Sequence, residues 1–274
     1  MRNAPNSRAN LDRALQRFAG DFVRANELRG LMANAIVAQM IGDGDVKGGS
    51  GLRFRFGERN TRVTMDLDTA WKSDLDSFLK NLKSRLAEGW NGFSGGIRML
   101  QQAKPKGIPF EYVMQPCEVK LRYLGNPWFT VSLEIGHNEI GDADARDMVE
   151  MPGTLAELCD FLSLPRLPPI PVMRLEYQVA QKLHGVSAPG SKRAHDLIDL
   201  QLIFANGNVD LPLAASLCRA LFRYRRVHEW PPYVVKGEDW DGLYNGQRQS
   251  LPVLPTADEA VAWANELIEK IDKA

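Results

Sequence analysis

The sequence contains few cysteines and no excess of charge of either sign. These two features argue against a cysteine metal centre and against a protein that coats nucleic acid. Its three cysteines stand far apart, without the spacing of metal ligands: Cys117, Cys159 and Cys218. This pattern predicts small buried thiols in a reducing compartment rather than a metal centre. Basic and acidic residues balance at 34 each, whereas a protein that coats nucleic acid is usually strongly basic. Any contact with RNA or DNA must therefore come from a local basic patch.

The sequence also lacks a long hydrophobic run. Its most apolar stretch, residues 28–41, is too short to span a membrane and contains Arg29 and Asn34. The N-terminal residues do not provide the apolar segment of a signal peptide. We therefore expect a cytoplasmic protein that does not associate with membranes.

Hydrophobic patterning predicts an α/β fold with a mixed sheet. Strands are expected over 46–48, 64–69, 110–123 and 128–135, the last two joined as a hairpin through Gly125-Asn126-Pro127. Apolar residues at helical spacing predict helices over 9–25, 27–41, 73–87, 172–184, 195–205, 211–226 and 256–272. Strands that alternate with helices, followed by a hairpin, are typical of a sheet covered by helices.

The most probable domain boundary on this pattern is a proline-rich segment. Four prolines fall within residues 165–171, which makes this stretch a stiff connector. With 274 residues, the chain is long enough for one large domain or two smaller ones. We expect an α/β catalytic domain over 1–164 and a helical domain over 172–274 that completes the active site.

A glycine turn, Lys47-Gly48-Gly49-Ser50, is the most informative feature of the chain. Such a turn can place backbone N–H groups and a hydroxyl against a phosphate. The following residues 50–56 alternate as a strand would, yet Ser50 is a good N-cap for a helix. We favour the helix, because its N-terminus would then face the phosphate.

Asp66 and Asp68 lie in the second motif, Arg62-Val63-Thr64-Met65-Asp66-Leu67-Asp68. On a strand their carboxylates would share one face, roughly 7 Å apart. Two such carboxylates repel each other, and a pair of Mg²⁺ ions would remove that repulsion. Glu134, which lies between two apolar residues of a predicted strand, is a candidate third ligand. The alternative is an acidic strand face exposed to water.

Two predicted helices in the second half carry charged residues beside apolar ones. Lys182 lies on the apolar stripe of its helix, where a lysine either extends to the edge or points into a polyanionic site. In the second case its ammonium would stabilise charge on departing pyrophosphate. Asp196 and Asp199 share one face of the next helix, where first-turn acids commonly complement the helix dipole. His195 is a candidate base or a solvated side chain.

Arg219, Arg223 and Arg226 recur at helical spacing along one predicted helix. One interpretation is an ordinary solvated helix face. The other is a binding surface for RNA phosphates, with nearby aromatic residues that stack on bases: Tyr224, Trp230 and Tyr233.

Together and in this order, these motifs resemble those of the AbiEii-type nucleotidyltransferase toxins, which include the MenT-type toxins. That family belongs to the polymerase-β-like nucleotidyltransferases. The resemblance extends from about Lys47 to Phe204 and rests on the glycine turn, residues 62–68, Lys182 within 180–183, and residues 193–199. The chain differs from the family pattern in having Gly51 where alanine is usual and Ile198 where an aromatic residue is common.

The resemblance implies a polymerase-β-like core and an enzyme that transfers NMP from an NTP to an acceptor, releasing pyrophosphate. It assigns binding of Mg²⁺, or of Mn²⁺ in its place, to Asp66 and Asp68. Lys182 would hold the triphosphate, and Asp196 would complete the catalytic set. The nucleotide phosphates would be bound by Gly48, Gly49, Ser50, Arg62 and Lys182. The resemblance also implies a separate antitoxin protein and, as in some members, the 3′ end of tRNA as acceptor.

Two other functions stay open on the sequence alone. The same chemistry could act on a protein hydroxyl or on a small molecule such as an aminoglycoside. Alternatively, the chain could bind a nucleotide or a partner without turnover. The arginine-rich helix favours RNA over a cationic drug, because like charges repel.

Overall fold

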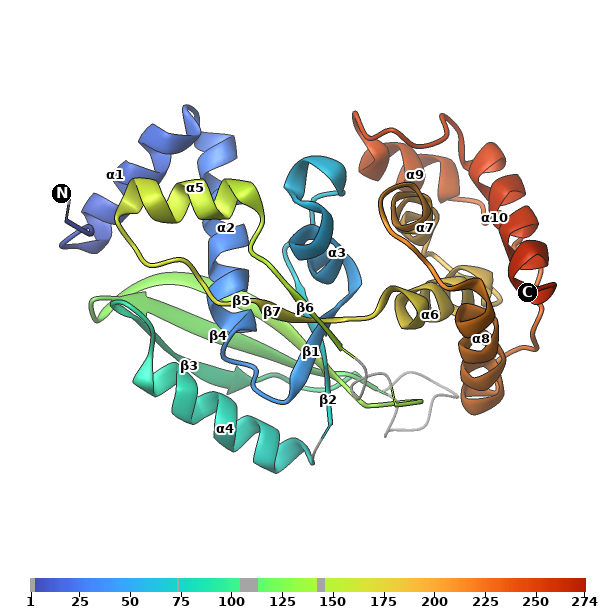
Figure 1. The fold of residues 1–274 in the computed structure, drawn as a ribbon, viewed down its shortest axis with the longest axis horizontal. Coiled ribbons are helices and arrows are strands. Elements are labelled where there is room, and N and C mark those ends of the chain that lie inside the picture. The colour runs from blue at the N-terminus through green and yellow to red at the C-terminus, as the bar shows by residue number, and fades with distance from the viewer. Residues whose placement is uncertain (1–2, 73, 104–112, 142–145) are drawn as a thin grey trace. The chain divides into compact units, whose positions relative to one another are not determined.

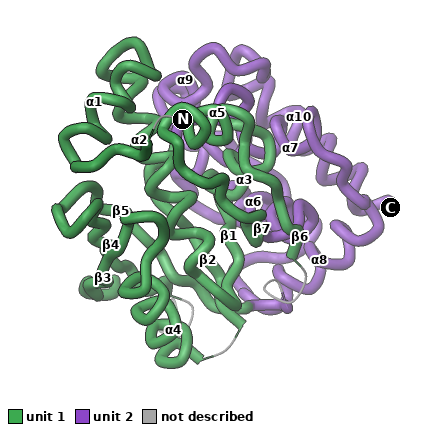
Figure 2. The backbone as a smooth tube through the Cα atoms, turned by 60° about the vertical axis from the view of Figure 1, so that its left-hand side comes forward, with its two compact units in different colours: residues 1–57, 64–138, 146–172 green, residues 58–63, 139–145, 173–274 purple. Residues whose placement is uncertain are grey.

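The computed structural model describes residues 3–72, 74–103, 113–141 and 146–274 (Figure 1). The chain divides into two compact units (Figure 2). Unit 1 consists of residues 1–57, 64–138 and 146–172, and unit 2 of residues 58–63, 139–145 and 173–274. Two short segments, residues 58–63 and 139–145, are thus grouped with the C-terminal helices. The domain division at residues 165–171 stays a prediction.

In the described residues, seven strands form one mixed sheet in the order β3-β4-β5-β2-β1-β7-β6. Their bounds are β1 Gly44–Lys47, β2 Leu67–Trp71, β3 Phe93–Met99, β4 Gln115–Tyr123, β5 Asn126–Gly136, β6 Arg146–Val149 and β7 Ile170–Met173. Strand β2 pairs antiparallel with β1 and parallel with β5, and β1 pairs parallel with β7. This mixed sheet confirms the predicted α/β fold.

The helices of unit 1 enclose the sheet. They are α1 Arg8–Ala19, α2 Phe22–Ala38, α3 Gly48–Phe56, α4 Leu75–Glu88 and α5 Gly153–Leu162. Figure 1 shows α1, α2 and α5 on one side of the sheet and α4 on the other. Ile36 of α2, Leu133 of β5 and Phe78 of α4 are completely buried, so the core lies on both sides of the sheet. Burial of this apolar surface is the main stabilising contribution to the unit.

Unit 2 is helical. Its helices are α6 Leu175–Ser187, α7 His195–Asn206, α8 Leu211–Arg225, α9 Trp240–Arg248 and α10 Ala257–Asp272. Helix α10 begins with a capping box, in which Thr256 and Glu259 each accept a backbone N–H of the other residue. Four of the five helices were predicted from apolar spacing, and α9 was not.

Several predicted boundaries in unit 1 are wrong, and each error has a local cause. The hairpin of β4 and β5 turns at Leu124-Gly125, both with positive φ, rather than at 125–127. Such a two-residue turn matches the twist of the strands. Strand β7 occupies part of the proline-rich segment 165–171, because a buried position beside β1 outweighs the weak strand propensity of proline. Residues 110–112 of the predicted strand lie outside the described residues.

The three cysteines are unpaired and buried, as predicted. Burial raises the pKa of the Cys117 and Cys159 thiols to about 11 and that of Cys218 to about 12. Within the described part of the chain, none of the helices has the length and hydropathy that crossing a membrane requires.

Candidate active site

The glycine turn lies where β1 passes directly into α3. Strand β1 ends at Lys47 and α3 begins at Gly48, so Gly48, Gly49 and Ser50 form the first helical turn. The N–H groups of a first turn lack partners within the helix and attract anions. This confirms the favoured helix, although its start differs from the prediction. Ser50 is not the N-cap, because its hydroxyl lies inside the first turn.

Ser50 instead connects this turn to the segment before β2. Its hydroxyl donates a hydrogen bond of 2.5 Å to the carbonyl oxygen of Asp66. The Ser50 side chain is buried, so this bond is shielded from water. The glycine turn and the acidic motif are therefore held together by one direct contact.

Asp68 lies in a row of charged residues across three neighbouring strands. Lys47 of β1 is opposite Asp68 of β2, which in turn is opposite Glu134 of β5. Cross-strand partners point to the same face of a sheet. Asp68 and Glu134 are half-buried on that face. The two carboxylates are therefore neighbours, as the prediction of Glu134 as a third ligand requires.

Asp66 occupies a different position from the predicted one. Strand β2 begins at Leu67, and Asp66 precedes it with an exposed side chain. The expected start of the strand at residue 64 fails because β1 ends opposite Asp68, leaving no residue of β1 to pair with Asp66. The carboxylate of Asp66 is consequently less confined than that of Asp68.

The backbone of Gly48 leaves room for the carboxylate of Asp68. Gly48 has a φ of +63°, and a Cβ atom built on it would collide with Oδ2 of Asp68. Only glycine combines this left-handed conformation with such a close approach. The carboxylate of Asp68 thus lies directly against the glycine turn.

Gly48→Ala is expected to lower nucleotidyl transfer by about tenfold or more, because the new methyl group displaces the carboxylate of Asp68. The left-handed backbone alone should reduce the free energy of unfolding by about 1 kcal/mol. Gly57→Ala is the matched control, since Gly57 has a φ of +81° and nothing within 4 Å of the added methyl. Turnover and urea unfolding of both variants test this. Equal activity of the two would contradict the role of the contact.

Lys47 is a residue that the sequence argument quoted but assigned no role. Its side chain is only 8% exposed, and it has no hydrogen bond or ion pair with any residue that the structure describes. Its Nζ lies over Gly136, where a Cβ would come within 2.7 Å. Asp68 is the cross-strand neighbour of Lys47, and a bound phosphate would supply further negative charge to this buried ammonium. A charged residue at the end of a buried strand, next to two glycines, was the signal that could have identified it.

The donor set of this face suits a hard divalent cation. Carboxylate oxygens are the ligands that Mg²⁺ prefers, and Asp68 and Glu134 present them side by side. Among the described residues, no group of three or more acidic, histidine or cysteine side chains is placed to hold a metal ion by itself. Mg²⁺ is commonly held by one or two carboxylates together with substrate phosphates. The residues present therefore fit such an ion together with a nucleotide.

The remaining predicted catalytic residues gather in unit 2 as a buried ion network. Lys182 of α6 is 4% exposed, and its Nζ donates to Oδ1 of Asp196 at 3.1 Å and to Oδ2 of Asp199 at 2.6 Å. Arg62 donates to both oxygens of Asp199, at 2.9 and 3.1 Å. Arg193 donates from Nε to Asp196 at 2.5 Å. Lys182 therefore points inward, and Asp199 is as deeply involved as Asp196.

In this network, the neighbouring positive charges lower the pKa of both aspartates more than burial raises it. Burial alone would raise the pKa of Asp196, but Lys182 and Arg193 hold it below its ordinary value. Lys182 and Arg62 lower the pKa of Asp199 in the same way against a similar burial. Both aspartates are therefore ionised at neutral pH. Burial lowers the pKa of His195, which favours the neutral imidazole.

The predicted RNA-binding arginines also lie in unit 2. Arg219 and Arg223 belong to α8, and Arg226 is its C-cap. Arg219 donates to the backbone oxygen and to Oδ1 of Asp272, at 2.9 and 3.2 Å. The structure thus groups the predicted residues into two sets. The glycine turn, Asp66, Asp68 and Glu134 belong to unit 1. The other predicted residues belong to unit 2: Arg62, Lys182, Asp196 and the arginines of α8.

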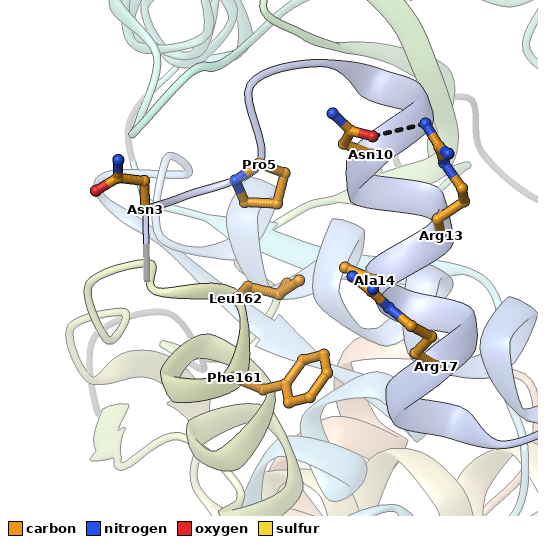
Figure 3. Close-up of a pocket in the computed structure, with 8 residues that line it drawn as sticks. All are labelled: Asn3, Pro5, Asn10, Arg13, Ala14, Arg17, Phe161 and Leu162. Atoms are coloured by element: carbon orange, nitrogen blue, oxygen red, sulfur yellow. Dashed lines mark hydrogen bonds between the residues drawn. The ribbon is translucent and has the colours of Figure 1, made fainter. Parts of the chain in front are cut away.

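Unit 1 has a further cavity, of about 660 Å³, between the N-terminal segment, α1 and α5 (Figure 3). Arg13 and Arg17 of α1 lie along it, with Phe161 and Leu162 of α5. Among the described residues that line it, none belongs to the glycine turn or the acidic motif. The volume of a cavity is therefore not sufficient to identify the active site of this protein.

Comparisons with known proteins identify the family of this chain. The sequence profile of the family described as "Nucleotidyl transferase AbiEii toxin, Type IV TA system" matches residues 46–266. Among solved structures, the chain is similar to MenT4, a nucleotidyltransferase toxin from Mycobacterium tuberculosis H37Rv. The identity is 18%, the TM-score is 0.54, and the match covers 97% of this chain and 98% of that one.

JHP933 from Helicobacter pylori also matches, at 16% identity and a TM-score of 0.47, over 90% of this chain and 92% of that one. A search of curated proteins found no match. The family match includes the glycine turn, the acidic motif, Lys182 and Asp196, and it covers most of the chain. The protein is therefore a nucleotidyltransferase and belongs to the AbiEii family of toxins from type IV toxin–antitoxin systems.

Proposed function

We propose that this nucleotidyltransferase uses Mg²⁺ to transfer NMP from an NTP to the 3′ end of tRNA. The observation that carries the proposal is the position of Asp68, next to Glu134 on one sheet face and in contact with the glycine turn. This places a phosphate-binding helix start beside oxygen ligands for a cation. Membership of a toxin family supports an acceptor whose modification is harmful to the cell.

In this proposal, the residues of unit 1 bind and orient the triphosphate. The N–H groups of Gly49 and Ser50 bind phosphate oxygens, and the ammonium of Lys47 neutralises their charge. Asp66 and Asp68, with Glu134 beside them, would hold Mg²⁺, which when bound neutralises phosphate charge and favours ionisation of an attacking hydroxyl. The hydrogen bond from Ser50 to Asp66 keeps the acidic motif in place against the phosphates.

The roles proposed for unit 2 follow from the family resemblance and from the ion network. Lys182 has three N–H donors, and Asp196 and Asp199 accept two of them. The third is available for a triphosphate oxygen. Arg62 is oriented by its two bonds to Asp199, and the family resemblance assigns it to the nucleotide phosphates. Asp196 acts in this proposal as a positioning residue for Lys182.

We further propose that the chain is the toxin of a two-protein system and is neutralised by a separate antitoxin. Membership of a type IV toxin family supports this partner. The cytoplasmic location expected from the sequence stays a prediction, and an acceptor RNA and an antitoxin would both be encountered there.

The test is label transfer from each of the four α-labelled NTPs to total RNA, with sizing of the labelled species. We expect one or more NTPs to label RNA of tRNA size, and EDTA to abolish labelling until excess Mg²⁺ restores it. Label on protein or on a small molecule would replace the tRNA acceptor by one of those classes. Nucleotide binding without any transfer would contradict catalysis by this chain.

A further inference from the structure

Unit 2 has a cavity of about 730 Å³ at the C-terminal end of α8. Its lining combines positive charge with aromatic rings: Arg219, Arg223 and Arg226 together with Phe222, His228 and Trp230. Two acidic residues, Asp272 and Glu229, also line it. The net charge of the lining is therefore positive, three arginines against two acids.

The arginines of this cavity differ in what they bind. Asp272 accepts hydrogen bonds from Arg219, so these two charges neutralise each other. The side chains of Arg223 and Arg226 are exposed, and their guanidinium groups form no hydrogen bond or ion pair with any residue in the described ranges. Two guanidinium groups at the cavity are therefore available for an anionic ligand. Guanidinium groups bind phosphate oxygens with two parallel hydrogen bonds.

The backbone of Arg226 is in a conformation that glycine adopts more easily. Arg226 ends α8 with φ 54° and ψ 30°, in the left-handed conformation, and its N–H donates to Phe222 at 3.0 Å. Glycine is the usual residue at this position of a helix end, because it adopts the conformation without strain. Replacing Arg226 by glycine is therefore expected to relieve backbone strain, so that it tests the guanidinium without loss of stability.

The aromatic residues form a fixed platform in the same cavity. Trp230 donates from Nε1 to Oδ1 of Asp272 at 2.8 Å, and its ring lies 5.3 Å from that of Phe222 at an angle of 75°. His228 packs 4.8 Å from Phe222, and its Nε2 lies 2.7 Å from Oγ of Ser187. Trp230 is only half-buried, so part of its ring is accessible. An accessible tryptophan held in one orientation can stack on a nucleobase.

We propose that this cavity is a subsite for an unpaired nucleotide of RNA, in which Arg223 and Arg226 bind phosphate and Trp230 stacks on the base. The proposal rests on the proposed function in taking this RNA to be the acceptor. The RNA-binding surface predicted from the sequence is thereby reduced to fewer residues. Arg219 is already neutralised by Asp272. Tyr233, although 74% exposed, is not among the described residues that line the cavity.

The test is fluorescence anisotropy of a five-nucleotide single-stranded RNA that carries fluorescein, titrated with the full chain without NTP. Arg223→Gln and Arg226→Gly are each expected to weaken binding about fivefold, and each to reduce the salt slope by about 0.7. Arg226→Lys should retain most of the affinity. Arg248→Gln, at the C-terminal end of α9 and outside the lining of the cavity, is the charge-matched control and should leave binding unchanged.

Arg226→Gly separates binding from folding, because it relieves the strain and should not lower the urea midpoint. Unchanged RNA binding by the Arg223→Gln/Arg226→Gly double variant would overturn the subsite. Tighter binding of an acidic peptide than of RNA, with the same dependence on both arginines, would overturn it in favour of a protein partner.

The label-transfer assay distinguishes this proposal from the proposed function. If the unaltered chain labels RNA and the double variant does so with the same KM, the subsite fails and the function stands. If the unaltered chain labels no RNA but binds the oligonucleotide through Arg223 and Arg226, the function fails and the subsite stands.

Discussion

Asp68→Asn is expected to reduce nucleotidyl transfer by a factor on the order of 10³, the largest loss of activity among single substitutions in unit 1. The amide keeps the shape of the side chain but removes the negative charge that would hold the cation beside the glycine turn. The half-buried side chain has nearly the same volume in both forms. We therefore expect the free energy of unfolding to change by about 0.5 kcal/mol at most.

The measurement is kcat for label transfer over a range of Mg²⁺ concentrations. A loss that excess Mg²⁺ partly recovers indicates weakened cation binding, and a loss at saturating Mg²⁺ indicates a contribution to turnover itself. Glu118→Gln is the matched control, since Glu118 is an acid on β4 that is bonded to Arg98 instead. Full activity of Asp68→Asn would remove the main support for the proposed site.

Lys182→Met is expected to lower the free energy of unfolding at pH 7 by about 3 kcal/mol or more, in addition to abolishing transfer. From the sequence alone, we expect Lys182→Ala to abolish transfer and leave the fold intact. The structure changes that expectation, because Lys182 compensates two carboxylates that are almost completely buried. Methionine fills a similar volume but leaves Asp196 and Asp199 with only their arginine partners. Urea unfolding at several pH values measures the effect.

The pH dependence of this loss follows from the pKa shifts. In the unaltered chain the pKa values of Asp196 and Asp199 are lowered, so their stabilising contribution is complete above the unfolded value near 3.9. That contribution is lost as the pH falls below this value. Lys182→Met removes the lysine that lowers both pKa values, so both should be higher than in the unaltered chain and protonation should relieve the variant. The difference in stability between the two chains should therefore shrink as the pH falls from 7 to 4.

A partly compensated variant checks the cause of the instability. Lys182→Met with Asp199→Asn removes one buried charge together with the lysine, and should recover about 1 kcal/mol or more relative to Lys182→Met alone. Lys182→Arg keeps the charge and should remain closer to the unaltered stability. Equal stability of all three variants at pH 7 would show that the network contributes little to folding.

The sequence was sufficient for the features that depend on local pattern. The passage from β1 into α3 followed from two glycines and a serine after a short strand, and α6, α7, α8 and α10 followed from apolar spacing. The proximity of Asp68 and Glu134 was predicted because both lie on strands with alternating burial. These positions require only the period of a helix or strand and the chemistry of a turn.

Other features depend on contacts between distant parts of the chain. The bond of Arg62 to Asp199 joins residues 137 positions apart, and nothing in either local sequence indicates it. The sequence position of Asp199 is typical of an acid that complements the helix dipole, yet this residue accepts hydrogen bonds from both Lys182 and Arg62. The sequence does not indicate a role for Lys47, because its side chain is buried only through the contact with Gly136 of β5. These positions depend on packing between residues far apart in the sequence. The periodicity of a single helix or strand carries no information about such packing.

The burial of the three thiols makes this chain well suited to site-specific labelling. With pKa values of about 11 to 12, Cys117, Cys159 and Cys218 would each be ionised in no more than about one molecule in 10,000 at neutral pH. Maleimide reagents should therefore ignore the native cysteines and react with one introduced at a surface position. A dye attached to Glu229→Cys would then report directly when RNA enters or leaves the neighbouring platform.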